Sequence, residues 1–176
     1  MRYLWTILLF ILFLTPSIGF TADVETINLK ANSAFRFSPD AQVWQQPDYW
    51  ATPQEAINKG LGDCEDYAVF KALLLRQAGV APELIRLAYV QAPGEKHLVT
   101  LLRQTLDDKD PLVLDNLIGS VRPLSRRPDL AVIFEFNSTT VWDSTGFQTS
   151  AGSSLLLKLT DVLRRVKNEG EFTLFF

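Results

Sequence analysis

The 176-residue sequence contains one cysteine and one histidine, and their positions allow nucleophilic chemistry. Cys64 falls in the first turn of an expected helix, where free backbone N–H groups and the helix dipole favour a thiolate and lower a thiol pKa. His97 lies in an expected strand, and Asp115 ends the next one. A hairpin loop centred near residue 107 places these two within about one position of each other across the strands. The pattern indicates a thiol nucleophile, its base and a carboxylate that orients the base.

Each of these residues also has an ordinary structural explanation. A lone histidine in a strand often packs or hydrogen-bonds without catalysing anything, and an unpaired cysteine is often buried and inert. Asp63 can serve as a helix N-cap, and Glu65 can interact favourably with the helix dipole. We favour catalysis because the only thiol, the only imidazole and Asp115 fall where they can converge.

The elements that must position these residues follow an α+β plan, with helices first, then a mostly antiparallel sheet, then a helix. Thr52-Pro53-Gln54-Glu55 has the N-cap, first-turn proline and third-position glutamate of a helix start. Longer helices are expected at 63–78 and 155–167 from their apolar spacing. Strands are expected at 85–91, 97–103, 111–116 and 131–136, with the acidic run 107–110 as a hairpin loop.

Composition and the N-terminus indicate an exported globular domain. Apolar residues make up 47% of the chain, which excludes a disordered chain, and the net charge of −3 argues against a nucleic-acid partner. Residues 4–14 form an apolar run behind Arg2 that is shorter than the roughly 20 residues of a membrane span. Small residues follow at Ser17 and Gly19, and a second cleavage point lies after Ala22. We expect a signal peptide at 1–22 and a mature domain at 23–176; the alternative is an uncleaved anchor.

Two strings carry a resemblance to a known family: Gly62-Asp63-Cys64-Glu65-Asp66-Tyr67 and Leu114-Asp115-Asn116. Together with shorter segments at 49–55, 87–90, 97–99, 127–130 and 136–137, they resemble the bacterial transglutaminase-like cysteine proteases of the LapG type. The resemblance covers about residues 28–170. It implies a papain-like fold in the broad sense, in which a helix carrying the cysteine packs on an antiparallel sheet carrying histidine and aspartate. It also implies the triad Cys64, His97 and Asp115.

The same resemblance implies a setting for the enzyme. Proteases of this family are periplasmic and calcium-dependent, and the acidic residues linked to calcium correspond here to Asp63 and Glu65. Their substrates are large surface adhesins, whose cleavage releases cells from a biofilm, and a membrane-bound receptor for cyclic di-GMP sequesters them. A cation would offset the repulsion among carboxylates beside a thiolate, with Asp66 or an acidic residue of another loop as a third ligand.

The mechanism also requires donors for the oxyanion. The Cys64 backbone N–H at the helix start is the natural first donor. Trp44 or Trp50 is a candidate for the second, although core packing explains both tryptophans equally well. Two rival functions use the same features: protein-glutamine acyl transfer through the same triad, and a non-catalytic envelope module that only binds a partner.

Overall fold

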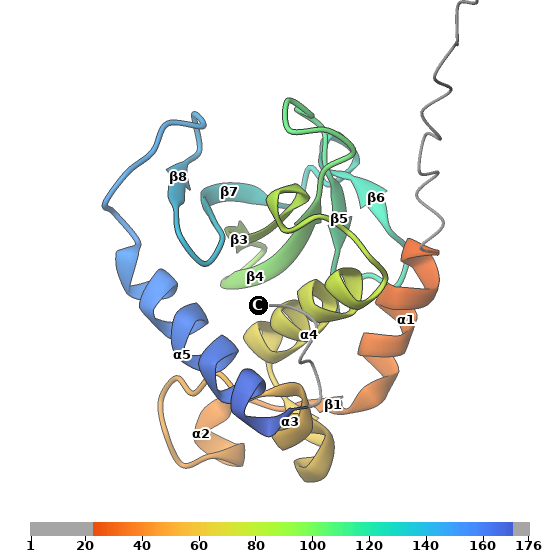
Figure 1. Cartoon of the computed structure of the whole chain (residues 1–176), viewed down its shortest axis with the longest axis vertical. Helices are drawn as coiled ribbons and strands as arrows, with labels where there is room; N and C mark the ends of the chain where they lie inside the picture. Colours follow the sequence, from red (N-terminus) through yellow and green to blue (C-terminus); the bar gives the residue numbers. More distant parts are fainter. Residues whose placement is uncertain (1–22, 171–176) are drawn as a thin grey trace, which may run out of the picture.

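The computed structural model describes residues 23–170, so the predicted signal peptide lies outside this part of the chain. Its largest element is a six-stranded antiparallel sheet with helices packed on one face (Figure 1). The strand order is β6-β5-β4-β3-β7-β8. The strands are β3 (Ile85–Ala92), β4 (Glu95–Leu102), β5 (Leu112–Leu114), β6 (Arg122–Pro123), β7 (Ala131–Phe136) and β8 (Val141–Asp143).

The helices lie before and after this sheet in the sequence, as expected for the α+β plan. They are α1 (Val24–Ala34), α2 (Asp40–Val43), α3 (Pro53–Lys59), α4 (Cys64–Gln77) and α5 (Ser153–Glu169), with 3₁₀ turns η1 (Pro82–Leu84) and η2 (Leu124–Arg126). A small parallel pair, β1 (Arg36–Phe37) and β2 (Leu61–Gly62), joins the N-terminal segment to the chain just before α4. Within residues 23–170, no helix has both the length and the apolar character needed to cross a membrane.

The predicted start of α3 is confirmed, and it fixes the approach to α4. The Thr52 hydroxyl accepts from the Glu55 amide at 3.2 Å, and the Glu55 carboxylate accepts from the Thr52 amide at 2.8 Å. The two residues form a capping box that satisfies two otherwise free N–H groups. The helix ends at Gly60, whose φ of 68° is the left-handed conformation that glycine adopts without strain.

Helix α4 is the central helix and packs against β4 and β3 (Figure 1). It buries Tyr67, Phe70 and Leu74, the apolar residues whose spacing predicted it. The hydroxyl of Thr100 in β4 donates to the backbone carbonyl of Ala68 at 2.8 Å. This bond ties the first turns of α4 to the strand that carries the histidine.

The hairpin of β4 and β5 has the register expected from the sequence. Thr100 pairs with Leu114, and the acidic run lies in the loop that joins the two strands. Asp115 follows β5 directly, so extending this register places it opposite Val99, two residues from His97. Residues two apart on one strand share a face of the sheet, so His97 and Asp115 come together diagonally.

Helix α1 was not predicted, and its inward side mixes apolar and polar residues. Asn28 and Ala31 are its fully buried residues, and Val24, Ile27 and Ala34 are partly buried against the core. Asp23 caps its N-terminus by accepting from the Thr26 amide at 3.2 Å. The short strands β6 and β8 were also missed, since two or three residues give no measurable alternation.

Candidate active site

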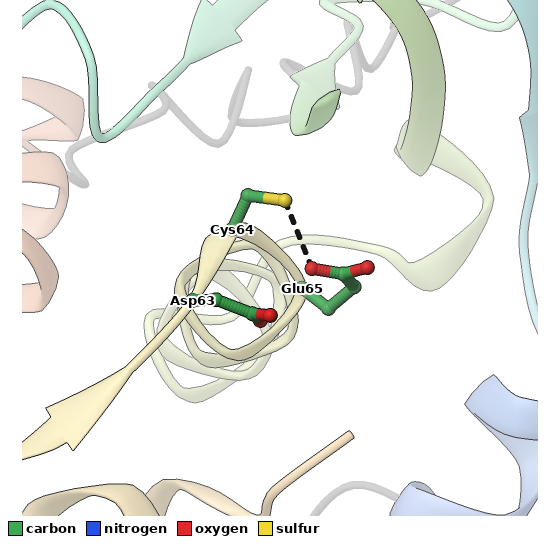
Figure 2. A group of neighbouring side chains, drawn as sticks. All are labelled: Asp63, Cys64 and Glu65. Carbon is green, nitrogen blue, oxygen red and sulfur yellow. Dashed lines mark hydrogen bonds between the residues drawn. The ribbon is translucent and has the colours of Figure 1, made fainter. Parts of the chain in front are cut away.

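Cys64 is the first residue of α4 and is partly buried. Figure 2 shows its side chain directed at the neighbouring carboxylate of Glu65; the thiol donates to Oε2 at 2.8 Å. The backbone N–H of Leu98 acts on the thiol in the opposite sense to its acidic neighbours and lowers its pKa. Because Leu98 follows His97 in β4, this interaction places the thiol beside the strand that carries the imidazole.

His97 and Asp115 form the direct pair predicted from the hairpin. Nε2 of His97 lies 2.7 Å from Oδ1 of Asp115, and the two residues are 3% and 1% exposed. Because Nε2 faces the carboxylate, Nδ1 is the ring nitrogen left to exchange a proton with a nucleophile. Burial raises the pKa of Asp115, but hydrogen bonds from His97, Leu117 and Arg127 outweigh it and bring that pKa to about 2. The carboxylate is therefore ionised at neutral pH.

Within residues 23–170, no hydrogen bond joins the Cys64 thiol to this pair. Among residues 23–170, the side-chain partner recorded for the Cys64 sulfur is Glu65 rather than His97. Burial, followed by the charges of Glu65 and Asp63, raises the pKa of the thiol. The sequence had predicted a lowered thiol pKa from the helix dipole, and the acidic neighbours oppose that effect.

Two residues that the sequence did not single out hold Asp115 in place. Nη2 of Arg127 donates to Oδ2 of Asp115 at 2.7 Å, and Arg127 is itself buried. The side-chain amide of Asn32 in α1 donates to the backbone carbonyl of Asp115 at 2.9 Å. Arg127 lies in one of the segments that carry the family resemblance, but no local pattern revealed its role. Asn32 lies in the unpredicted α1.

Four carboxylates gather around the N-terminus of α4. Oxygens of Asp40, Asp63 and Asp66 lie within 4.8 Å of one another, and Asp63, Cys64 and Glu65 form an overlapping group. Within the described chain, Oδ1 of Asp40 and Oδ1 of Asp63 are buried without a hydrogen-bond partner. Asp40 comes from α2, and it is the acidic residue of another segment that the sequence anticipated without naming.

This concentration of negative charge shifts the pKa values of the cluster. Burial, then Glu65, raises the pKa of Asp63 to about 10. Burial raises the pKa of Asp66 to about 8, although amides of Ala51 and Asp63 partly oppose it. Such shifts mean that the site favours either protons or a cation.

The donor set fits calcium, which prefers several carboxylate and carbonyl oxygens. Asp63 and Glu65 would hold the ion, and Asp40 adjoins Asp63, since Oδ1 of both Asp40 and Asp63 needs a partner. Asp66 fits less well, because its two oxygens already accept from the Ala51 amide at 2.7 Å and the Asp63 amide at 3.2 Å. Asp40, with its unpartnered Oδ1, is therefore the stronger candidate for a third ligand, and Asp66 in the same group is the other.

The tryptophans proposed as oxyanion donors have different surroundings. The indole N–H of Trp50 donates to Asp48 at 3.1 Å, so this residue is engaged and does not serve as predicted. Trp44 stacks near Tyr49, and Lys59 lies over its ring. Its Nε1 is buried without a partner in residues 23–170. Trp44 alone keeps a free donor.

Comparisons with known proteins decide the family. Residues 15–140 match the model of the bacterial transglutaminase-like cysteine proteinases. The chain belongs to this family. It is therefore a cysteine peptidase with a transglutaminase-like fold, as the resemblance in the sequence predicted. Comparison with curated proteins found no significant match.

Solved structures of Legionella pneumophila LapG are similar over most of the cysteine proteinase domain. One aligns with a TM-score of 0.67 and 31% identity, covering 81% of this chain and 76% of that one. A calcium-bound LapG structure aligns with a TM-score of 0.69 and 30% sequence identity, covering 81% of this chain and 78% of that one. An EGTA-treated LapG structure aligns with a TM-score of 0.68 and 30% sequence identity, covering 81% of this chain and 76% of that one.

Proposed function

We propose that this cysteine proteinase is a calcium-dependent periplasmic endopeptidase that uses Cys64, His97 and Asp115 as its triad. The observation that carries the assignment is the buried hydrogen bond between His97 and Asp115. The amide of Leu98, the next residue in the same strand, lowers the pKa of the Cys64 thiol. A histidine that only packed in the core would not require an ionised carboxylate as its hydrogen-bond partner. This pair, beside the only thiol of the chain, is suited to general-base and general-acid catalysis.

The reaction proceeds through an acyl-enzyme. The Cys64 thiolate attacks the scissile carbonyl, and the bond between carbonyl carbon and amide nitrogen breaks. His97 accepts the thiol proton and then gives it to the leaving amine, while Asp115 orients the ring and stabilises its charged form. Water, deprotonated by His97, then hydrolyses the thioester. The Cys64 backbone N–H at the start of α4 stabilises the oxyanion, a contribution of about 3 kcal/mol when a donor is well aimed.

Calcium supplies positive charge to the acidic cluster when it is bound. Asp63 and Glu65 would hold it, with Asp40 beside Asp63, and the proposal is supported by the existence of calcium-bound and EGTA-treated structures of LapG. Engaging Glu65 and Asp63 weakens the two charges that raise the thiol pKa. It would also fix the first turn of α4, from which Cys64 and its amide project.

The substrate, the partner and the compartment are proposals that rest on the family and on the sequence. The substrate is a large surface adhesin, cleaved near its N-terminus so that the cell leaves a biofilm. An inner-membrane receptor for cyclic di-GMP is the proposed regulator. The apolar run at 4–14 behind Arg2 supports export to the periplasm through a signal peptide at 1–22.

The test is product analysis with an N-terminal adhesin fragment from the same organism. Purified protein in calcium should yield two fragments with a free carboxylate at the new C-terminus, both with and without an added primary amine. A product in which the amine is attached would instead support the acyl transferase. An intact fragment under all conditions would contradict peptidase activity on this substrate class.

A further inference from the structure

Asp115 is contacted through both of its carboxylate oxygens. Oδ1 accepts from Nε2 of His97 at 2.7 Å and from the Leu117 amide at 3.0 Å. Oδ2 accepts from Nη2 of Arg127 at 2.7 Å. Arg127 is 2% exposed, so this ion pair is withdrawn from solvent and little screened.

Arg127 is in turn fixed by a second carboxylate. Its Nε donates to Oδ1 of Asp129 at 3.0 Å, and Nη2 donates to Oδ2 at 2.7 Å. This two-point contact uses the planar geometry of the guanidinium. Asp129 is partly exposed, with its side chain at 33%. The guanidinium thus connects the proposed triad to a carboxylate near the surface.

A second cation acts on the same carboxylate from the helix side. Lys71 in α4 is 1% exposed, and its charge interacts with Asp115. The charged groups that face Asp115 are therefore His97 from β4, Lys71 from α4 and Arg127 after η2, while α1 contributes the neutral amide of Asn32. Arg127 and His97 are both hydrogen-bonded to Asp115, whereas Lys71 acts on it through its charge.

We propose that Arg127 is a positioning residue for the peptidase reaction. It holds Asp115 in the orientation that His97 needs, and it reduces the extent to which Asp115 stabilises the protonated imidazole ring of His97. The inference rests on the triad of the proposed function. One carboxylate shared between a guanidinium and an imidazolium stabilises the imidazolium less than an unshared one does. His97 then releases its proton to the leaving amine more readily, while its ring stays fixed through Nε2.

Arg127→Gln is the direct test, with Arg126→Gln as the matched control. Arg126 is the exposed neighbour and its replacement changes the net charge equally. Cleavage by Arg127→Gln should fall about 100-fold in kcat/KM, with partial recovery in Arg127→Lys, while Arg126→Gln keeps the parent rate. Equal rates for the Arg127→Gln and Arg126→Gln proteins, both folded, would overturn the proposal.

NMR provides a readout that does not depend on cleavage. The chain has one histidine, so an untagged Cys64→Ala protein has a single imidazole to titrate. The titration midpoint of His97 should move to higher pH in Arg127→Gln, because Asp115 then acts on the imidazolium alone. It should move to lower pH in Asp129→Asn, because the guanidinium of Arg127 then acts more strongly on Asp115. A general charge effect predicts a similar shift from Arg126→Gln, which removes the same charge without touching Asp115, so the shift of Arg127→Gln should clearly exceed that of Arg126→Gln.

The outcomes separate this inference from the proposed function. The role of Arg127 would be overturned if the His97 midpoints of Arg127→Gln and Asp129→Asn moved in the same direction, or if neither moved. This holds whether or not the protein cleaves its substrate. If Arg127→Gln does not fold, Asp129→Asn alone decides by the sign of its shift. Absence of cleavage by the parent protein would count against the peptidase proposal only, because the titration is measured independently.

Discussion

His97 and Asp115 have unequal roles in the proposed reaction. His97 moves the proton, whereas Asp115 holds the ring and its charge through the 2.7 Å hydrogen bond to Nε2. We expect His97→Ala to reduce cleavage more than about 1,000-fold and Asp115→Asn by a smaller but still severe factor. Cleavage rates of folded variants, checked by circular dichroism, measure this. A His97→Ala protein that retains the parent rate would remove the imidazole from the mechanism.

The Cys64 thiol should report the state of the acidic cluster. Burial, Glu65 and Asp63 raise its pKa, so without a cation little thiolate exists at pH 6. In EGTA, iodoacetamide should react more slowly with Cys64 than with a free cysteine peptide, and calcium should accelerate the reaction at least about tenfold. Identical rates with and without calcium would show that no bound cation influences the thiol. Cys64→Ala is the blank for labelling.

The candidate triad could be proposed from the sequence because rare residue types and the register of one hairpin are local information. Cys64, His97 and Asp115 followed from a helix start and one loop, and the register of Thr100 with Leu114 matches the expected pairing. Arg127 could not be found in this way. Its contact with Asp115 depends on how the segment after η2 folds back, and nothing in the nearby sequence encodes that path.

At the scale of elements, helix α4 could be predicted from local sequence, whereas helix α1 could not. Helix α4 was predicted within one residue because its buried side is apolar and Gly79 ends it with a φ of 87°. Helix α1 was missed although Val24, Ile27, Ala31 and Ala34 recur at helical spacing, because asparagines interrupt this short apolar pattern. The side-chain amide of Asn28 donates to the carbonyl of Gly119 at 2.8 Å, and that of Asn32 donates to Asp115. Polar contacts of this kind have no periodic signature.

Gly62 controls the junction of β2 with α4. A Cβ there would lie 2.7 Å from Oδ2 of Asp66 and 2.9 Å from the Phe35 ring. Gly62→Ala should therefore destabilise the protein by about 1–3 kcal/mol, because the helix start must shift. Urea unfolding measures the change. Gly119→Ala is the control, since its nearest atom would lie 3.9 Å away. Equal stability of the two variants would contradict this account of the junction.

At the scale of the whole molecule, the acidic cluster links stability to pH. Asp63 and Asp66 have folded pKa values of about 10 and 8, above those of an unfolded aspartate. Between pH 5 and 7 the folded state keeps these protons while the unfolded state loses them. Stability in EGTA should therefore fall as pH rises, on the order of 1 kcal/mol per pH unit for each retained proton.

This window avoids the buried lysine. Burial lowers the pKa of Lys71 to about 7, so its contribution increases with pH above that value and would mask the trend. Calcium should flatten the slope between pH 5 and 7, because the bound ion takes the place of protons. The melting temperature measured by calorimetry at several pH values tests this. A slope that is the same in calcium and in EGTA would contradict the proposed ligands.

The central claim is that the Cys64 thiol cleaves a peptide bond of a surface adhesin in a calcium-dependent reaction. Intact-mass spectrometry of the adhesin N-terminal fragment tests it most directly, after incubation with the parent protein or with Cys64→Ala at equal calcium. The account predicts two new masses that sum to the fragment plus one water with the parent protein, and an unchanged fragment with Cys64→Ala. The same two masses produced by Cys64→Ala, or an unchanged fragment with the parent, would contradict it.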